Sequence, residues 1–113
     1  MFNDVTSTAV RSALDALSMR QRVIADNMAN VNTPGFLAGR VTFESELAGA
    51  VRSGSGAVSG TVARSLEPTR ENGNNVNLDH EVLANIDTGL RYQLMVRAVD
   101  HEFSLVRTAA RTQ

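Results

Sequence analysis

A dense run of turn-forming residues lies near the start of the chain: Asn27-Met28-Ala29-Asn30-Val31-Asn32-Thr33-Pro34-Gly35-Phe36. Pro34 presets φ for the second position of a tight turn, and Gly35 can take the positive φ that the third position requires. The side chains of Asn30, Asn32 and Thr33 can hydrogen-bond to nearby backbone groups. We therefore expect a helix to end here, with a type II-like turn at Pro34-Gly35 that sets the direction in which the chain leaves it.

The residues before this stretch have the apolar periodicity of one helix face. Gln21 is the single polar position in the series, and a polar residue in a coiled-coil seam can select register or partner. Thr6, Ser7 or Thr8 can cap the start of the helix. We predict an N-terminal helix with its turn motif over residues 8–32. Its apolar positions are spaced by fours and threes, and they are Val10, Leu14, Leu17, Ile24, Met28 and Val31.

The middle of the chain, residues 37–75, differs in composition from both ends. It contains a Gly/Ser run over 53–60, which has little apolar surface to bury and which we interpret as a flexible loop. Residues 41–43 and 61–63 have strand-like composition, and we expect them to form at most a short β-hairpin. The turn cluster at 71–75 closes this segment.

A second helical pattern begins near Leu78, where Asn77 or Asp79 can cap the first turn, and continues over 78–111. Such a helix would run for roughly 50 Å at about 1.5 Å per residue. Its apolar arc is wider than a single partner helix needs, so we expect one stripe to pack on the N-terminal helix and the other on neighbouring subunits. One stripe contains Leu83, Leu90, Leu94, Ala98 and Leu105, and the other contains Tyr92, Val96, Val99, Phe103 and Val106.

The length and composition favour a single, mainly α-helical module over residues 1–113. Aromatic residues make up 4% of the chain and there is no Trp, so Leu, Val, Ile, Met and Ala supply the core, as is typical of helix-to-helix packing. We predict that the long N- and C-terminal helices pack as a coiled-coil-like pair, joined by the flexible middle.

Charge and composition exclude several function classes. Eleven basic and twelve acidic residues give a net charge of −1, which supplies no field for binding nucleic acid or an anionic membrane. The absence of cysteine excludes disulfides and thiolate metal sites. The first residues contain no basic segment followed by an apolar run, so we expect no cleaved signal peptide.

The residues that most resemble catalytic groups are His80 and His101, each within an Asp-His-Glu tripeptide. Their separation on one helix corresponds to roughly 30 Å, so they cannot share a metal or a substrate within one chain. Neither begins a His-Glu-x-x-His motif, and the chain contains no Gly-x-Ser-x-Gly elbow and no lysine for a phosphate loop. We therefore expect no catalytic residue, cofactor, metal or small-molecule substrate, and we interpret both histidines as solvated or partner-facing.

The stretch at 27–36, at the end of a helix near the chain start, resembles the N-terminal motif of bacterial flagellar rod, hook and hook-associated proteins. The C-terminal half, with 75–82 followed by 90–93, is similar to that of a proximal rod subunit. FlgC, a sibling axial protein, usually has a Glu-rich start to this helix, which this chain lacks. The resemblance covers about residues 8–40 and 72–111.

This resemblance implies a non-enzymatic structural subunit of the proximal rod of the flagellar basal body, in the periplasmic part of the cell envelope. It also implies export through the flagellar type III apparatus without a cleaved signal peptide. The implied partners are the rod proteins FlgC, FlgF and FlgG, the adaptor FliE, the export gate and further copies of the chain. The terminal helices would become ordered when neighbours cover their apolar faces. The alternatives are a sibling such as FlgC, or a helical adaptor that binds one partner through its apolar stripe.

Overall fold

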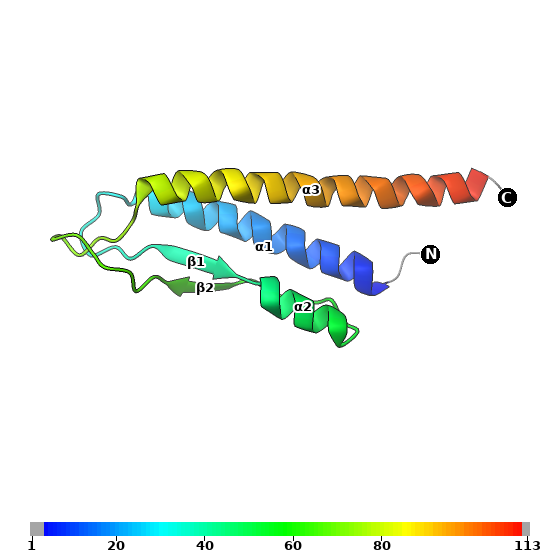
Figure 1. Cartoon of the computed structure of the whole chain (residues 1–113), viewed down its shortest axis with the longest axis horizontal. Coiled ribbons are helices and arrows are strands. Elements are labelled where there is room, and N and C mark those ends of the chain that lie inside the picture. The colour runs from blue at the N-terminus through cyan, green and yellow to red at the C-terminus, as the bar shows by residue number, and fades with distance from the viewer. Residues whose placement is uncertain (1–3, 112–113) are drawn as a thin grey trace.

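Two long helices lie side by side and run in opposite directions in the computed structural model, which describes residues 4–111 (Figure 1). Helix α1 spans Asp4–Ala29 and helix α3 spans Leu78–Arg111. A hairpin of strands β1 (Gly39–Thr42) and β2 (Thr61–Arg64), together with helix α2 (Glu44–Arg52), lies on the side of α1 opposite to α3. The predicted fold class, long terminal helices packed together with a short hairpin between them, is confirmed.

The core forms around α1 because this helix is covered from two sides. Ala13, Ala16 and Leu17 of α1 are buried together with Val41 and Phe43, which lie at the end of β1 and just after it. The small alanine side chains allow the hairpin to come close to the helix. Sequence periodicity identified only one apolar seam on α1 and missed this second, alanine-rich face. Half-buried residues packed around the core are Met19, Val23, Leu47, Val58, Tyr92 and Met95.

The two strands pair antiparallel, with Gly39 opposite Arg64 and Val41 opposite Val62. The ladder extends by one more bond, because Ser65 N donates to Ala38 O at 2.7 Å. Gly39 is required where β1 meets α1, since a Cβ at this position would lie 2.9 Å from Cγ1 of Val23. The hairpin is therefore held directly against α1.

Helix α2 is a correction to the expectation that the middle contains at most a hairpin. Its sequence suits a short helix, because Glu44 and Glu46 lie in the first turn and Arg52 in the last, where they complement the helix dipole. The Gly/Ser run that follows is docked on α1: Ser12 Oγ donates to Gly56 O at 2.9 Å and accepts from Val58 N at 3.1 Å. The position of this run is therefore defined by α1.

The helix limits agree with the sequence at three of four ends. α1 ends at Ala29, the third residue of the motif and before the Pro34-Gly35 turn, and α3 spans the predicted residues. Asn77 caps α3, since its Oδ1 accepts from His80 N at 3.2 Å. The predicted start of α1 was wrong, because the helix begins at Asp4, and Thr6, Ser7 and Thr8 lie inside it and do not cap it.

Val31 is also corrected, because it lies beyond the last residue of α1 and so cannot belong to its apolar face. Its carbonyl oxygen accepts a hydrogen bond from Arg70 Nη2 at 2.6 Å. Across residues 4–111, no helix combines the length and the hydropathy needed to cross a bilayer.

Candidate assembly surface

The turn at Pro34-Gly35 has the geometry that the sequence predicts. Gly35 has a φ of 75°, and Phe36 N donates to Thr33 O at 3.2 Å, which closes a four-residue turn. Gly35 N in turn donates to Asn72 O at 2.8 Å. The turn therefore lies directly against the segment that precedes α3.

The other motif residues hold this turn to its surroundings. Asn30 Nδ2 donates to Asp26 O at 2.8 Å, and Thr33 Oγ1 donates to Asn30 Oδ1 at 3.0 Å. Phe36 lies under the guanidinium of Arg64, 5.3 Å from ring centroid to Cζ. The remaining members, Ala29, Asn32 and Pro34, are exposed.

Asn27 has a different role from the one that its place in a turn motif suggests. It lies within α1, and its side chain is fully buried. Its carboxamide forms a pair of bonds with Gly39: Nδ2 donates to Gly39 O at 3.0 Å and Oδ1 accepts from Gly39 N at 2.8 Å. Nδ2 also donates to Glu81 Oε1 at 2.8 Å. One side chain thus connects α1, β1 and α3.

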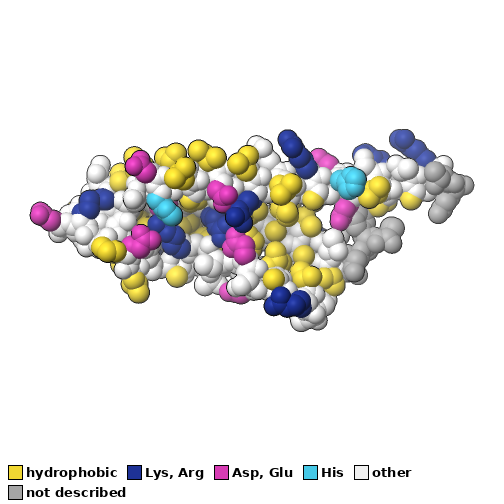
Figure 2. Space-filling model, viewed as in Figure 1, with side chains coloured by type: hydrophobic (Ala, Val, Ile, Leu, Met, Phe, Trp, Pro, Cys, Tyr) yellow, Lys and Arg dark blue, Asp and Glu magenta, His cyan; other side chains and the backbone are white. Residues whose placement is uncertain are grey.

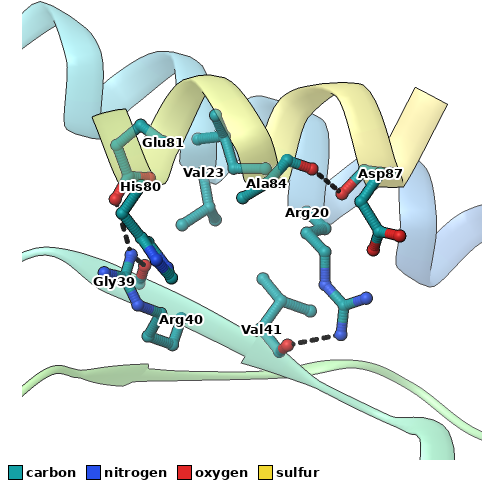
Figure 3. A pocket seen from close by; sticks show the side chains of 11 residues that line it. Arg20, Val23, Gly39, Arg40, Val41, His80, Glu81, Ala84 and Asp87 are labelled. Atoms are coloured by element: carbon teal, nitrogen blue, oxygen red, sulfur yellow. Dashed lines mark hydrogen bonds and ion pairs between the residues drawn. The ribbon is translucent and has the colours of Figure 1, made fainter. Parts of the chain in front are cut away.

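Glu81 is the partner that sequence analysis missed. It is fully buried, and its Oε2 accepts from Arg40 Nη1 at 2.9 Å in an ion pair. We use the term Glu81 cluster for Asn27, Gly39, Arg40 and Glu81. Figure 3 shows Gly39, Arg40 and Glu81 beside a cavity of about 210 Å³ between α1, β1 and α3. No sequence pattern indicates this role, because an isolated Glu in the first turn of a helix is usually explained by the helix dipole.

Two asparagines before α3 were also underestimated, since the sequence suggested only a turn at 71–75. Asn74 is fully buried and its Nδ2 donates to the carbonyl oxygens of Asn30 and Thr33, both at 2.8 Å. Asn75 Oδ1 accepts from Ala38 N at 2.7 Å. These amides join the turn motif at the end of α1 to the segment that precedes α3. The sequence stretches around residues 27–36 and 72–82, which lie far apart in the chain, therefore meet in one junction.

A second polar contact fixes the start of α2. Arg20 of α1 donates to both carboxylate oxygens of Glu44, at 2.7 and 2.9 Å, and to Val41 O at 2.7 Å. The hydrogen bonds from Arg20 lower the pKa of the Glu44 carboxyl below its ordinary value of 4.5. Arg20 thereby covers the edge of β1 two residues beyond the point where Asn27 covers it.

The apolar residues of α3 are divided between an inner and an outer face. Tyr92, Val99 and Val106 are half-buried, and Val99 and Phe103 line a shallow cavity with Val10 of α1. The rest of the predicted α1 seam lies inward as well: Leu17 and Ile24 are buried, and Leu14 and Met28 are half-buried.

The outer face of α3 carries large apolar residues that no part of residues 4–111 buries. Leu83, Leu90 and Leu94 are 68%, 62% and 62% exposed, and Figure 2 shows hydrophobic side chains along the edge formed by this helix. The buried residues of α3 are instead the polar Glu81 and Thr88. We use the term outer stripe for Leu83, Ile86, Leu90 and Leu94.

The structure assigns no chemistry to the histidines. His80 and His101 are both exposed on α3. Among the described residues, no group of three or more His, Cys, Asp and Glu side chains is arranged to hold a metal ion. The geometry is that of packing surfaces and polar cross-links.

A family model described as "Flagella basal body rod protein" matches residues 9–36, which contain most of α1 and the whole turn motif. The chain is 34% identical over 116 residues to the flagellar basal body rod protein FlgB of Borreliella burgdorferi, an alignment that covers 82% of this chain and 86% of that protein. The chain belongs to the FlgB family. It is also 32% identical to FlgB of Escherichia coli, with 79% and 80% of the two chains covered, and 27% identical to FlgB of Bacillus subtilis, with 88% of each covered.

Membership of the FlgB family makes this chain a structural protein of the flagellar basal body and not an enzyme. It associates with other components of the flagellar rod. The residues matched by the family model end at Phe36, so the outer stripe lies outside them.

Proposed function

We propose that this chain is a subunit of the proximal rod that is exported by the flagellar type III apparatus without a cleaved signal peptide and assembles through α1 and α3. Its neighbours in this proposal are FlgC, FlgF and FlgG, the adaptor FliE, the export gate and further copies of the chain. The observation that carries the proposal is the exposed outer stripe of α3.

The exposure of the outer stripe supports assembly because it is continuous along one helix. Single exposed apolar residues are common on any protein, whereas a contiguous patch marks an interaction site. Covering one of these leucines gains about 1.5–3 kcal/mol. α3 also projects beyond the start of α1 (Figure 1), which leaves its C-terminal turns open to a neighbour.

The assembly mechanism that we propose is ordering on contact. The buried polar contacts of α3 lie near the hairpin, where Glu81 bonds to Asn27 and Arg40, and Tyr92 and Met95 add apolar packing in the middle of the helix. Toward its C-terminus the helix has mainly exposed side chains, and an isolated helical segment of this kind is marginal in water. Neighbouring subunits would supply the missing burial.

Leu94→Asp tests the proposal directly. A carboxylate buried without a partner at an interface costs several kcal/mol, so we expect rod assembly and motility to be lost while secretion of the variant continues. Gln93→Asp is the matched control, because it adds the same charge at an exposed neighbouring position. The measurements are motility, the protein content of isolated basal bodies and the amount of variant secreted.

Normal basal bodies with Leu94→Asp would contradict the proposal, as would equal loss with Gln93→Asp. Ile24→Asp is a fold control and not an assembly probe, because Ile24 is buried within the subunit. Recovery of a stoichiometric soluble complex with a single protein that is not a rod component would support the adaptor alternative instead.

A further inference from the structure

In the first half of α3, the face turned toward the rest of the subunit is polar and the face turned toward solvent is apolar. Burial of apolar surface alone predicts the reverse. Each residue of the outer stripe follows an inner residue by two positions, which corresponds to about 200° around a helix. The inner positions are the more polar set, and two of them, Glu81 and Thr88, are buried. The inner residues are Glu81, Ala84, Thr88 and Tyr92, and the outer residues are Leu83, Ile86, Leu90 and Leu94.

In the first half of α3, apolar burial would favour a different rotation of the helix about its own axis. Turning the helix by half a turn would place the three leucines of the outer stripe against α1, and each buried leucine is a substantial gain. The same rotation would return Glu81 to water, where its carboxylate is well solvated. Tyr92 and Met95 pack against the core and hold the second half of α3 in the observed rotation, whereas the first half has no such apolar contact and needs a specific polar one.

The Glu81 cluster supplies this contact. Glu81 Oε1 accepts from Asn27 of α1, and Oε2 accepts from Arg40 of β1. Asn27 is itself fixed by both backbone groups of Gly39. Glu81 can reach these partners only when its own face of α3 is turned toward α1 and β1, and Figure 3 shows its side chain pointing toward Arg40 and Gly39 of β1.

The cluster is poorly suited to serve as a source of stability alone. Nη2 of Arg40 is buried and has no hydrogen-bond partner within the described part of the chain, and burying a charged pair often costs as much as it returns. The best-attested role of such buried polar groups is to select one arrangement among several. Thr88, the other buried polar residue of α3, needs no partner on α1 or β1, since its hydroxyl donates to Ala84 O in its own helix at 2.7 Å.

We propose that Glu81 is a positioning residue that sets the rotation of α3, so that the leucines of the outer stripe face away from α1. Its hydrogen-bond partners are Asn27 on α1 and Arg40 on β1. The inference concerns the isolated subunit and goes beyond the proposed rod function. It holds or fails whatever binds the outer stripe.

The absence of cysteine from the chain allows a direct test with single-cysteine reporters. Leu90→Cys reports on the outer face and Thr88→Cys on the inner face, and the rate of modification by a maleimide is measured at each in the monomer. With Glu81 present, we expect Leu90→Cys to react rapidly and Thr88→Cys slowly. In a Glu81→Leu background, the ratio of the two rates should fall by about tenfold or more, because the two positions exchange burial.

Two further variants separate rotation from a general loss of stability. Glu81→Gln keeps one acceptor oxygen, which can accept from Asn27 or from Arg40 but not from both, so the ratio should fall less than in Glu81→Leu. Adding Leu83→Gln and Leu94→Gln to Glu81→Leu removes the gain from rotation and should return Thr88→Cys to slow modification. A purely stabilising role for Glu81 predicts no such rescue.

Three results would overturn the inference: unchanged rates at both reporters in Glu81→Leu, rates that rise together at both, or failure of the double glutamine change to restore protection. Helical content is followed by circular dichroism throughout. If Glu81→Leu does not fold, Glu81→Ala takes its place with the same reporters and the same criteria.

Discussion

Asn27 shows how much of this structure depends on single polar side chains. A carboxamide carries one acceptor and one donor group side by side, so it can pair with the N–H and C=O of one residue as a neighbouring strand would. Asn27 does this with Gly39 and thereby covers the free edge of β1. An uncovered edge is a site for unwanted strand pairing, so this asparagine protects the hairpin as well as anchoring it.

Replacement of Asn27 by Asp should destabilise the subunit by about 3 kcal/mol or more, because it removes the donor to Gly39 O and places a second carboxylate beside Glu81. Urea unfolding followed by circular dichroism measures the effect. Asn32→Asp is the control, since Asn32 belongs to the same motif and is exposed. Equal stability of the two variants would remove Asn27 from its proposed role in the junction.

Gly35 is the second residue whose chemistry is specific to its position. A Cβ there would meet no atom within 4 Å, so substitution costs only backbone strain at a φ of 75°, on the order of 1–3 kcal/mol for a β-branched residue. We expect motility to fall in the order wild type, Gly35→Asn, Gly35→Val, with similar secreted amounts, because Asn tolerates this region better. Full motility of Gly35→Val would show that the turn does not matter for assembly.

At the scale of elements, the docking of the Gly/Ser run on α1 depends on Gly56. This residue has a φ of 70°, and a Cβ would lie 2.6 Å from Val5 O and 3.1 Å from Ala9 N. Gly56→Ala should therefore lift the run from α1 and raise amide hydrogen exchange across residues 53–60.

Gly54 provides a matched control for that experiment. It too has a positive φ, of 90°, but a Cβ at Gly54 would meet nothing within 4 Å. Gly54→Ala therefore carries the backbone strain without the collision. If both alanine variants raised exchange to the same extent, the close approach to Val5 and Ala9 would not be the cause.

The elements themselves were largely predictable, because local signals specify them. Periodicity and the Asn77 cap gave the limits of α3, and strand composition with turn residues gave the hairpin. Helix α2 was missed because its nine residues form a segment too short for its apolar pattern to stand out, and none of its side chains is fully buried. Glu81 and Asn74 were missed for another reason: their partners lie 54 and 44 residues away in the sequence, and no local pattern reveals such a contact.

At the scale of the whole molecule, packing is uneven along the long axis. The chain measures 67 × 26 × 14 Å. The hairpin end contains the buried polar junction, the centre contains the core around Ala16 and Leu17, and the far end is formed by exposed turns of α3. Neighbouring rod subunits would have most to add at that far end.

Amide exchange in a verified monomer should follow this gradient. We expect the slowest exchange in α3 over residues 81–92 and the fastest over residues 100–111, and in α1 we expect faster exchange before Ala13 than around Ile24. Assembly into rods should slow the fast regions selectively. Uniformly slow exchange over all of α1 and α3 in the monomer would contradict ordering on contact.

The antiparallel arrangement of α1 and α3 also determines how the subunit responds to mechanical force. Asp4 and Arg111, the outermost described residues, lie toward the same end of the molecule, and the junction of Asn27, Glu81 and Asn74 lies at the other (Figure 1). When tension is applied between the N-terminal end of α1 and the C-terminal end of α3, the helices therefore separate one turn at a time. The whole contact between them is not sheared at once. The weakly packed turns yield first and the polar junction last, so the subunit can be unwound by a small steady pull from its ends although its opposite end is firmly bonded.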